Sequence, residues 1–213
     1  DTTTVQYDAV GNAIAMTDAL GRLTTHTYDD RNRLVKTTRP DPDGARPESA
    51  PVTLYAYDPV GNLISMTDAL GRVTQYGYDE LNRRVEIIDA RGATASLAYD
   101  AVGNRISMTD VLGRTTEYEY DGLDRLVKIS EADPDDAGAQ AAPVTLHTYD
   151  AVDNLVSITD ALGRVTVYGY DGLNRSTSIT DALGNRSDVR YDAMGNAIAV
   201  VDALGRVTQN IYD

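Results

Sequence analysis

The chain has 213 residues, of which 42% are hydrophobic, and it contains no cysteine, tryptophan or phenylalanine. The absence of cysteine excludes disulfide bonds, thiolate nucleophiles and thiolate metal ligands. The net charge of −14 argues against nucleic-acid phosphates and anionic membrane surfaces as partners, because both require a basic protein surface. No apolar run approaches the roughly 18 residues of a membrane-spanning helix.

A Tyr-Asp pair recurs along the chain, usually at intervals of 21 residues and twice at intervals of 29. The pairs begin at Tyr7, Tyr28, Tyr57, Tyr78, Tyr99, Tyr120, Tyr149, Tyr170, Tyr191 and Tyr212. The two longer intervals contain inserts rich in Pro and Asp, at 39–51 and 130–143. The inserts belong to a second period of 92 residues, so four short repeats with one insert form a larger unit.

Each short repeat predicts two strands. In the first, Ile14 and Met16 face one way between small residues, as expected of a half-buried strand. In the second, Tyr76 and Tyr78 share a face, and such aromatic residues favour strands. A helix is not expected, since two glycine-type breakers in every repeat leave no helix of useful length.

Two turns separate the strands of each repeat, and the typical turn opens with Asp-x-x-Gly. The Asp can accept hydrogen bonds from nearby backbone N–H groups, and the fourth position needs positive φ if a type I turn closes a hairpin. Gly, Asn or Asp occupies this position throughout, and these residues tolerate left-handed backbone. We therefore predict structural turns with positive φ at Gly11, Gly21, Gly61, Gly71, Gly92, Gly103, Gly113, Gly163, Gly184, Gly195, Gly205, Asn32, Asn82 and Asn174. Asp124 and Asp153 occupy the same position.

A lone hairpin is marginally stable in water, so the hairpins must stack into one continuous sheet that is stabilised mainly by contacts between neighbours. The predicted fold is all-β, with tandem antiparallel hairpins of about 21 residues in a coiled or spiralling sheet. Tyr ends a strand as a packing anchor and Asp opens the next turn. The predicted anchors are Tyr28, Tyr57, Tyr78, Tyr99, Tyr120, Tyr149, Tyr170 and Tyr191.

The repeats resemble YD repeats, also called Rhs repeats, of bacterial Rhs polymorphic toxins, insecticidal toxin complexes and animal teneurins. The matching motifs are the Tyr-Asp pair, the Gly-Asn or Asn-Arg after it, and the run Asp-x-x-Gly-Arg-x-Thr-x-Tyr-x-Tyr-Asp. They cover nearly the whole chain apart from the inserts. The resemblance implies a long β-sheet that spirals into a hollow shell, often around a C-terminal toxin domain. It also implies a bacterial protein that is extracellular or at the cell surface.

Few residues suggest chemistry beyond structure, and we predict no catalytic, cofactor-binding or metal site. His26 and His147 each stand two residues before a Tyr-Asp pair, where other repeats have Tyr, so we interpret them as packed aromatic substitutes. Calcium would prefer carboxylates, but most aspartates open turns. The remaining calcium candidates are Asp41, Asp43, Asp133, Asp135 and Asp136 in the inserts.

Two further surface patterns have structural interpretations beside functional ones. An Arg follows many turn glycines, and we expect a structural row of ion pairs with the turn aspartates; recognition of an acidic glycan or partner is the alternative. These arginines are Arg22, Arg72, Arg114, Arg164 and Arg206. The pattern Asn-Arg-Ser, typical of N-glycosylation, begins at Asn174 and Asn185.

We expect residues 1–213 to be a single repeat array and a segment of a longer protein, because the first and last repeats are incomplete. The favoured function is a structural wall that encloses or displays another domain, without enzymatic activity. One alternative is a tubular fibre: about eight strands per turn would give a coil filled by its own side chains. The other is an adhesion module that binds glycan or protein. The expected partners are neighbouring repeats of the same or identical chains, and an enclosed toxin domain.

Overall fold

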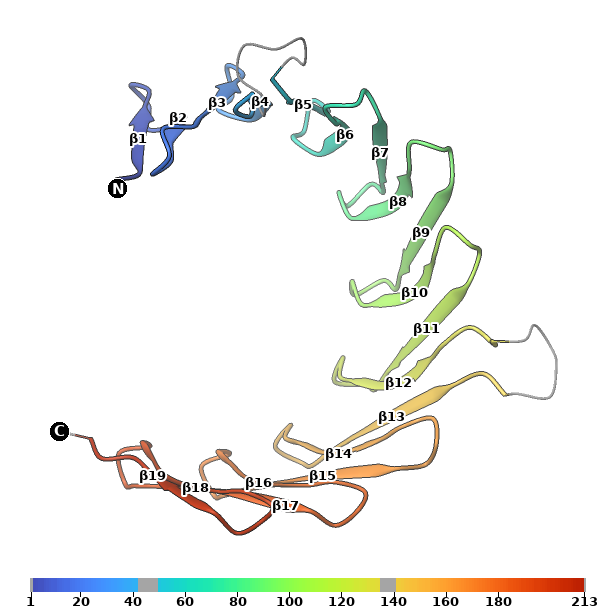
Figure 1. Cartoon of the computed structure of the whole chain (residues 1–213). Coiled ribbons are helices and arrows are strands. Elements are labelled where there is room, and N and C mark those ends of the chain that lie inside the picture. Colours follow the sequence, from blue (N-terminus) through green and yellow to red (C-terminus); the bar gives the residue numbers. More distant parts are fainter. Residues whose placement is uncertain (1, 42–49, 135–140, 213) are drawn as a thin grey trace. The chain divides into compact units, whose positions relative to one another are not determined.

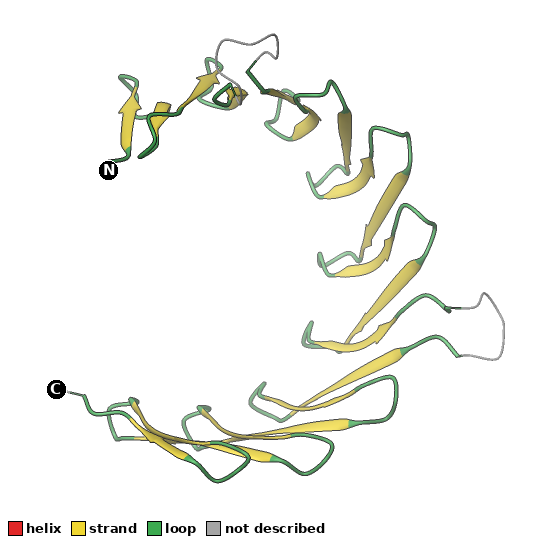
Figure 2. Ribbon diagram, in the orientation of Figure 1, coloured by secondary structure: helices red, strands yellow, loops and turns green. Residues whose placement is uncertain are grey.

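The structure is a computed structural model that describes residues 2–41, 50–134 and 141–212 (Figure 1). Within these residues there are 19 strands and no helix (Figure 2). The strands belong to one open antiparallel sheet, which confirms the predicted fold of tandem hairpins.

The strands are short and follow one another at regular intervals. The first nine are β1 (Thr4–Tyr7), β2 (Ala13–Thr17), β3 (Leu23–Tyr28), β4 (Leu34–Thr38), β5 (Val52–Tyr57), β6 (Leu63–Thr67), β7 (Val73–Tyr78), β8 (Arg84–Ile88) and β9 (Thr94–Tyr99). The others are β10 (Arg105–Thr109), β11 (Thr115–Tyr120), β12 (Leu126–Ser130), β13 (Val144–Tyr149), β14 (Leu155–Thr159), β15 (Val165–Tyr170), β16 (Ser176–Thr180), β17 (Arg186–Tyr191), β18 (Ala197–Val201) and β19 (Val207–Gln209).

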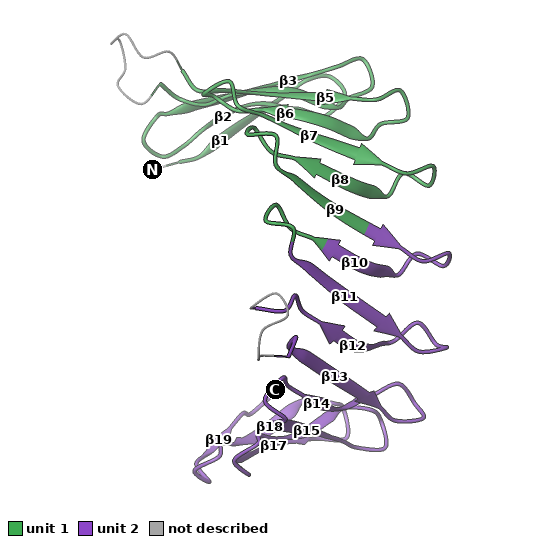
Figure 3. Ribbon diagram, turned by 90° about the vertical axis from the view of Figure 1, so that its right-hand side faces the viewer, with its two compact units in different colours: residues 1–97, 109–113 green, residues 98–108, 114–213 purple. Residues whose placement is uncertain are grey.

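The chain divides into two compact units, one of residues 1–97 with 109–113 and one of residues 98–108 with 114–213 (Figure 3). In the first unit, each strand from β1 to β8 pairs antiparallel with the next strand along the chain. In the second unit, the same holds from β11 to β19.

Because consecutive strands are antiparallel, the turns alternate between the two ends of the strands in each unit. We call the turns that begin at the Asp of a Tyr-Asp pair YD turns. They are residues 8–12, 29–33, 58–62, 79–83, 100–104, 121–125, 150–154, 171–175 and 192–196. We call those at the other end leucine turns, since Leu stands third in all but one of them. They are residues 18–22, 68–72, 89–93, 110–114, 160–164, 181–185 and 202–206.

Both inserts replace leucine turns. The first connects β4 to β5, and the backbone N–H of Arg39 donates to the carbonyl of Pro51 at 2.9 Å. The second connects β12 to β13, and Glu131 donates to Pro143 at the same distance. A backbone hydrogen bond therefore joins the two ends of each insert, so the added residues do not interrupt strand pairing.

The sheet has two unlike faces. One face, which we call the tyrosine face, carries cross-strand pairs of Tyr with Met or Ile, such as Tyr55 with Met66. The opposite face carries mainly small and polar residues, such as the pair of Thr148 with Ser157, with single apolar residues such as Leu54 among them. This division follows from the period of two in each strand.

Neither face is covered by a second layer of the described residues. No described side chain as large as Leu is fully buried, and the buried residues are Thr37, Ala95, Ser178 and Ala199. Ile64 and Ile179 on the tyrosine face remain about half exposed. The sheet is thus held together by its ladder and by contacts between neighbouring hairpins rather than by an enclosed core.

Candidate functional site

Each turn is built around the carboxylate of its first residue. In the YD turn that begins at Asp8, Oδ1 accepts from the N–H groups of Val10 at 3.0 Å and Asn12 at 2.8 Å, and Oδ2 accepts from Asn12 Nδ2. Bonds to the Asn12 side chain, together with those from the backbone, hold the pKa of Asp8 below its usual value of 3.8. The carboxylate is therefore a structural acceptor with its oxygens already occupied.

The fourth residue of the turns has left-handed backbone in both rows. Among the glycines, φ ranges from 74° at Gly163 to 109° at Gly61. The other residues with positive φ are Asn32, Asn82, Asp124, Asp153 and Asn174, at 58–70°. Among the described residues, the glycines with positive φ are Gly11, Gly21, Gly61, Gly71, Gly92, Gly103, Gly113, Gly163, Gly184, Gly195 and Gly205.

The Tyr of most Tyr-Asp pairs donates its hydroxyl to a backbone carbonyl of the preceding hairpin, and we call this contact a Tyr hook. Tyr170 donates its hydroxyl to the Leu155 carbonyl at 3.0 Å, where the preceding YD turn ends. The bond also bridges the inserts, since Tyr57 reaches Leu34 and Tyr149 reaches Leu126, both at 2.9 Å. The same bond is made by Tyr28, Tyr78, Tyr120, Tyr191 and Tyr212. Tyr99 ends β9 at the equivalent position.

The fifth residue of the YD turns alternates between Asn and Arg, and both link one turn to the next. Asn62 Nδ2 donates to Asn82 Oδ1 at 2.8 Å. Arg33 Nη1 donates to the Asp58 carbonyl at 2.9 Å, and its guanidinium lies over the ring of Tyr57, 4.7 Å from the centroid. Burial raises the pKa of Tyr57, and the nearby arginine opposes this shift. Successive YD turns are thus joined along their row.

The Gly-Asn and Asn-Arg motifs are visible in the sequence, but this role of the fifth residue was not predicted from them. The signal was present, because the fifth residue alternates strictly along the chain. The asparagines are Asn12, Asn62, Asn104, Asn154 and Asn196, and the arginines are Arg33, Arg83, Arg125 and Arg175. The alternation has the period of two hairpins, which makes each Asn turn a neighbour of an Arg turn.

The leucine turns use their arginines locally. Arg164 pairs with Asp160 of its own turn at 2.6 Å, and Arg72 pairs in the same way with Asp68. Arg22 and Arg206 repeat this pattern with Asp18 and Asp202. Arg114 occupies the same position of its turn. Each of these ion pairs lies within one turn, so each of the four arginines already neutralises the Asp of its own turn.

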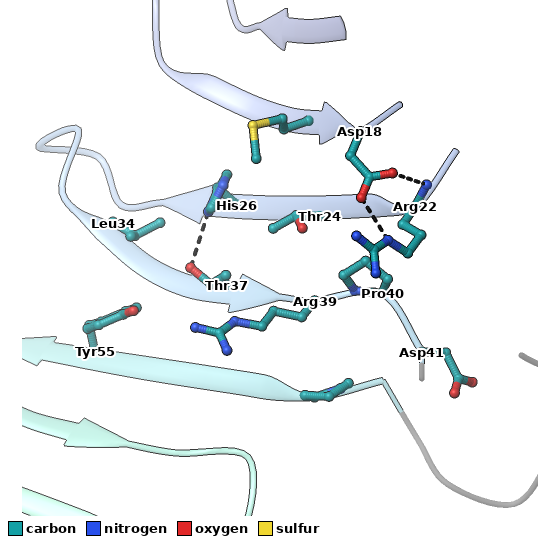
Figure 4. A pocket seen from close by; sticks show the side chains of 12 residues that line it. Asp18, Arg22, Thr24, His26, Leu34, Thr37, Arg39, Pro40, Asp41 and Tyr55 are labelled. Carbon is teal, nitrogen blue, oxygen red and sulfur yellow. Dashed lines mark hydrogen bonds and ion pairs between the residues drawn. The ribbon is translucent and has the colours of Figure 1, made fainter. Parts of the chain in front are cut away.

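A groove of about 800 Å³ lies on the tyrosine face where the first insert begins (Figure 4). His26 faces Thr37 across the strands, with 3.1 Å between Nδ1 and Oγ1. The Arg39 side chain extends between Thr37 and Tyr55 (Figure 4). The groove combines two arginines and two carboxylates, Asp18 and Asp41, with an imidazole and an aromatic ring. Because Asp18 is already paired with Arg22, this set suits binding of a polar or anionic group better than acid–base catalysis.

The second histidine has a different environment. His147 lies opposite Ile158 on the tyrosine face, and its Nδ1 is buried without a hydrogen-bond partner among the described residues. An apolar cross-strand neighbour offers no donor or acceptor. The two histidines lie on different compact units.

The acidic candidates do not assemble into a site in the described part of the chain. No group of three His, Asp or Glu residues there could hold a metal ion. Asp41 and Asp133 lie near the beginnings of their inserts, whereas Asp43, Asp135 and Asp136 lie outside the described residues.

The two asparagines of the Asn-Arg-Ser pattern are engaged in turns. Asn174 accepts from Asn154 at 3.1 Å, and Asn185 donates to Asp181 at 2.8 Å. Within the described ranges, no helix is long and apolar enough to cross a membrane.

The chain was compared with solved structures and with curated proteins. It matches the structure of TcdB2-TccC3 with a TM-score of 0.70 and 17% identity, over 98% of this chain and 13% of that one. It matches a Tc holotoxin pore of Photorhabdus luminescens with a TM-score of 0.61 and 17% identity, over 94% of this chain and 13% of that one. At this identity the likeness shows a shared fold. No curated protein matches the chain.

The chain spans only about one eighth of the length of those chains. The sequence model of the RHS Repeat family matches it four times, at residues 7–45, 57–94, 99–136 and 149–186. These matches cover most of the chain and contain most of the turns, Tyr hooks and strands described above. The chain therefore belongs to the RHS repeat family.

Proposed function

We propose that the chain is a structural wall segment of a large secreted or cell-surface bacterial protein that encloses or displays another domain. The observation that carries this proposal is the single-layer sheet with an uncovered tyrosine face. A monomeric soluble protein rarely leaves a continuous apolar surface exposed. Here Met16, Ile64 and Ile179 of that face are all about half exposed.

The turns supply the properties that a wall needs. Each hairpin is fixed to its neighbour by a Tyr hydroxyl and by the Asn or Arg of the YD turns. Stability then grows with the number of hairpins, and no second layer is required. The fold is shared with TcdB2-TccC3, which supports a role in a large assembly.

The partners that fit this role are neighbouring repeats, in the same chain or in identical chains, and an enclosed domain such as a toxin. We propose that residues 1–213 form one array within a longer protein. In this proposal the segment is not an enzyme, binds no cofactor and contacts no nucleic acid. Its turn carboxylates are already used by turn N–H groups, which leaves them poorly suited to catalysis.

Cysteine labelling of the parent protein, with any cysteine outside this segment replaced, tests the proposal, because the segment itself contains no natural cysteine. One variant carries Met66→Cys on the tyrosine face, and its matched control carries Ser65→Cys on the opposite face of the same strand. Each is treated with a small maleimide and with a large polyethylene-glycol maleimide. If the tyrosine face is the enclosed side of a wall, the small reagent should label both variants. The large reagent should label only Ser65→Cys, on the outer face.

Other patterns would contradict an enclosing wall. A solid tubular fibre would hide one face from both reagents, and electron microscopy would show filaments. Equal labelling of both faces by the large reagent would leave a sheet that encloses nothing.

The groove beside the first insert favours adhesion as a second candidate function. Arg39 and Tyr55 together offer a cation and a ring to a carboxylate-bearing sugar. A glycan array of the 213-residue chain would show binding to acidic glycans that Arg39→Ala abolishes. Arg164→Ala, on a leucine turn away from the groove, is the control and should bind normally. Equal binding by both variants would remove adhesion at this groove.

A further inference from the structure

A second groove of the first unit lies over strands β3 to β6, on the face opposite the tyrosine face. It has a volume of about 500 Å³. Lys36 is the only charged residue among the described residues that line it. On this face its lining residues are Thr27, Lys36, Leu54, Ala56, Ser65 and Thr67. The groove is thus a mainly apolar and hydroxyl-bearing recess with a single positive charge.

The period of 92 residues provides a copy of this region in the second unit, and the two copies differ at Lys36. In the second unit, Lys128 Nζ donates to Glu119 Oε1 of the neighbouring strand at 2.7 Å. In the groove, Thr27 takes the position of Glu119 and stands opposite Lys36. No carboxylate of the described residues pairs with Lys36. The first unit therefore presents an ammonium group whose equivalent in the second unit is neutralised.

The two copies also differ at the bottom of the groove. In the second unit, Thr148 Oγ1 lies 2.6 Å from Ser157 Oγ. In the groove, Ala56 stands opposite Ser65 at the equivalent positions. Ala56 has no hydroxyl to offer to Ser65, and its methyl group leaves open the space that a threonine side chain would fill. The same part of the sheet thus has both an unpaired charge and additional space.

An apolar side chain completes the surface beside the ammonium group. Leu54 stands opposite Lys36 on the next strand and is 46% exposed. A ligand that uses both residues needs one negative charge and an apolar stem. The net charge of −14 does not exclude such an anion, because no described lining residue is acidic and exposed charges more than about 8 Å away are largely screened at physiological ionic strength.

We propose that this groove binds a small aliphatic monocarboxylate. Its carboxylate takes the place beside Lys36 that the Glu119 carboxylate has beside Lys128. The Ser65 hydroxyl can donate to this carboxylate, and the apolar chain of the ligand packs against Leu54 and Ala56. The inference goes beyond the proposed wall function, because it requires no enclosed domain and concerns the opposite face of the sheet.

An NMR titration of the ¹⁵N-labelled 213-residue chain with sodium hexanoate, at constant ionic strength, tests the proposal. The wild type should show saturable shifts of backbone amides in β4 and β5, with a Kd on the order of 1 mM. Lys36→Met keeps the apolar stem but removes the charge, and it should weaken binding at least about tenfold. Lys128→Met is the matched control in the second unit, and its Kd should stay within about twofold of the wild type.

Two further probes separate the charge from the apolar stem. Acetate keeps the carboxylate but lacks most of the chain, and 1-hexanol keeps the chain but lacks the charge. Each should bind at least about tenfold more weakly than hexanoate. The proposal would be overturned by the absence of saturable shifts, by a probe that binds as tightly as hexanoate, or by equal losses in Lys36→Met and Lys128→Met.

A second experiment transfers the site instead of removing it. The double variant Glu119→Thr with Thr148→Ala gives the second unit the residues that the groove has at those positions. It should acquire saturable hexanoate shifts in β12 and β13 that the wild type lacks. Thr27→Glu, which copies the ion pair of the second unit, should abolish the shifts in β4 and β5. If neither variant changed the pattern of shifts, the comparison of the two copies would not identify the site and the proposal would fail.

Discussion

At the YD turns, Asn and Arg side chains reach the next turn along the row, whereas the recorded ion pairs of the leucine turns stay within one turn. The two rows of turns nevertheless have the same backbone conformation. In both, the carboxylate of the first residue accepts from N–H groups and the fourth residue has positive φ. The Tyr hooks also end beside the YD turns. Cohesion between hairpins is therefore concentrated at one end of the strands.

This asymmetry explains where the chain tolerates extra residues. Both inserts replace leucine turns, and the hooks of Tyr57 and Tyr149 cross them unchanged. An insert in a YD turn would separate the Asn or Arg from the next turn and remove several contacts at once. Lengthening a leucine turn costs mainly loop entropy, which grows slowly with length.

Acidification should have the largest effect, because it acts on both rows. The backbone N–H of Arg22 lowers the pKa of Asp18, and the Arg175 side chain lowers that of Asp171. Carboxylates with a folded pKa below 3.8 stabilise the fold above that pH, and this stabilisation is lost as the pH falls through the folded pKa. Thermal unfolding followed by circular dichroism should show a constant midpoint at pH 5 to 7, approximately, and a steep fall below about pH 3.8. A midpoint that rises on acidification would contradict the role of the turn carboxylates.

Removing a Tyr hook should be the most damaging of the single substitutions. Tyr170→Ala loses ring packing and the bond to Leu155, and we expect a loss of about 3 kcal/mol in unfolding free energy. Tyr170→Phe loses only the hydroxyl and should cost about 1 kcal/mol. Urea denaturation at a low protein concentration measures both.

A leucine-turn variant provides the control for the hook. Leu162→Ala removes a side chain that projects into solvent and should leave the unfolding free energy unchanged. If Leu162→Ala destabilised the monomer as much as Tyr170→Ala, cohesion would not be concentrated beside the YD turns.

The backbone requirement is equal in the two rows, and glycine substitution tests this. Gly71 has φ of 76° and open space around its missing Cβ, so any cost arises from the backbone rather than from a clash. Gly71→Val should cost about 2 kcal/mol, because β-branched residues resist left-handed backbone. Gly71→Asn should cost much less, since Asn82 adopts φ of 60° at the equivalent position. Unchanged thermal stability of Gly71→Val would contradict the turn assignment.

Much of the fold was predictable from sequence because its determinants are local. The repeated Asp and the Gly, Asn or Asp three residues later specify a turn of fixed length, and alternation along Ile14 to Met16 specifies a strand. The repeat interval then places the strands in chain order within the sheet. Local patterns of this kind need no information about distant residues.

The links between hairpins were harder to predict because they join residues of different repeats. Asn62 and Asn82 lie 20 residues apart, and Arg33 reaches the carbonyl of Asp58. Neither contact can be predicted from the sequence of one turn alone. Only the alternation of Asn and Arg over two hairpins indicates that neighbouring turns are linked. The groove at Arg39 likewise depends on β3, β4 and β5 together, so it could not be predicted from the sequence of a single repeat.

Among the changes considered, replacing an arginine should change the unfolding free energy least. This substitution nevertheless distinguishes the YD turns from the leucine turns most directly. Arg175 of a YD turn is 26% exposed and pairs with Asp171, whereas Arg164 of a leucine turn is 65% exposed and pairs with Asp160, both at 2.6 Å. Only Arg175 also donates to the Asp192 carbonyl and lies over the ring of Tyr191. Arg175→Ala should therefore cost about 1 kcal/mol, chiefly through the lost stacking.

Arg164→Ala is the matched variant, and it should not change the urea midpoint measurably, because an exposed ion pair contributes little. Arg175→Lys sharpens the test, because it keeps the charge but loses the planar guanidinium that stacks on a ring and donates several hydrogen bonds. Its unfolding free energy should therefore be close to that of Arg175→Ala. If Arg175→Lys behaved like the wild type, charge alone would explain the YD turns. Equal losses at Arg164 and Arg175 would show that an arginine stabilises its own turn in both rows, and the links between turns would then contribute nothing to cohesion.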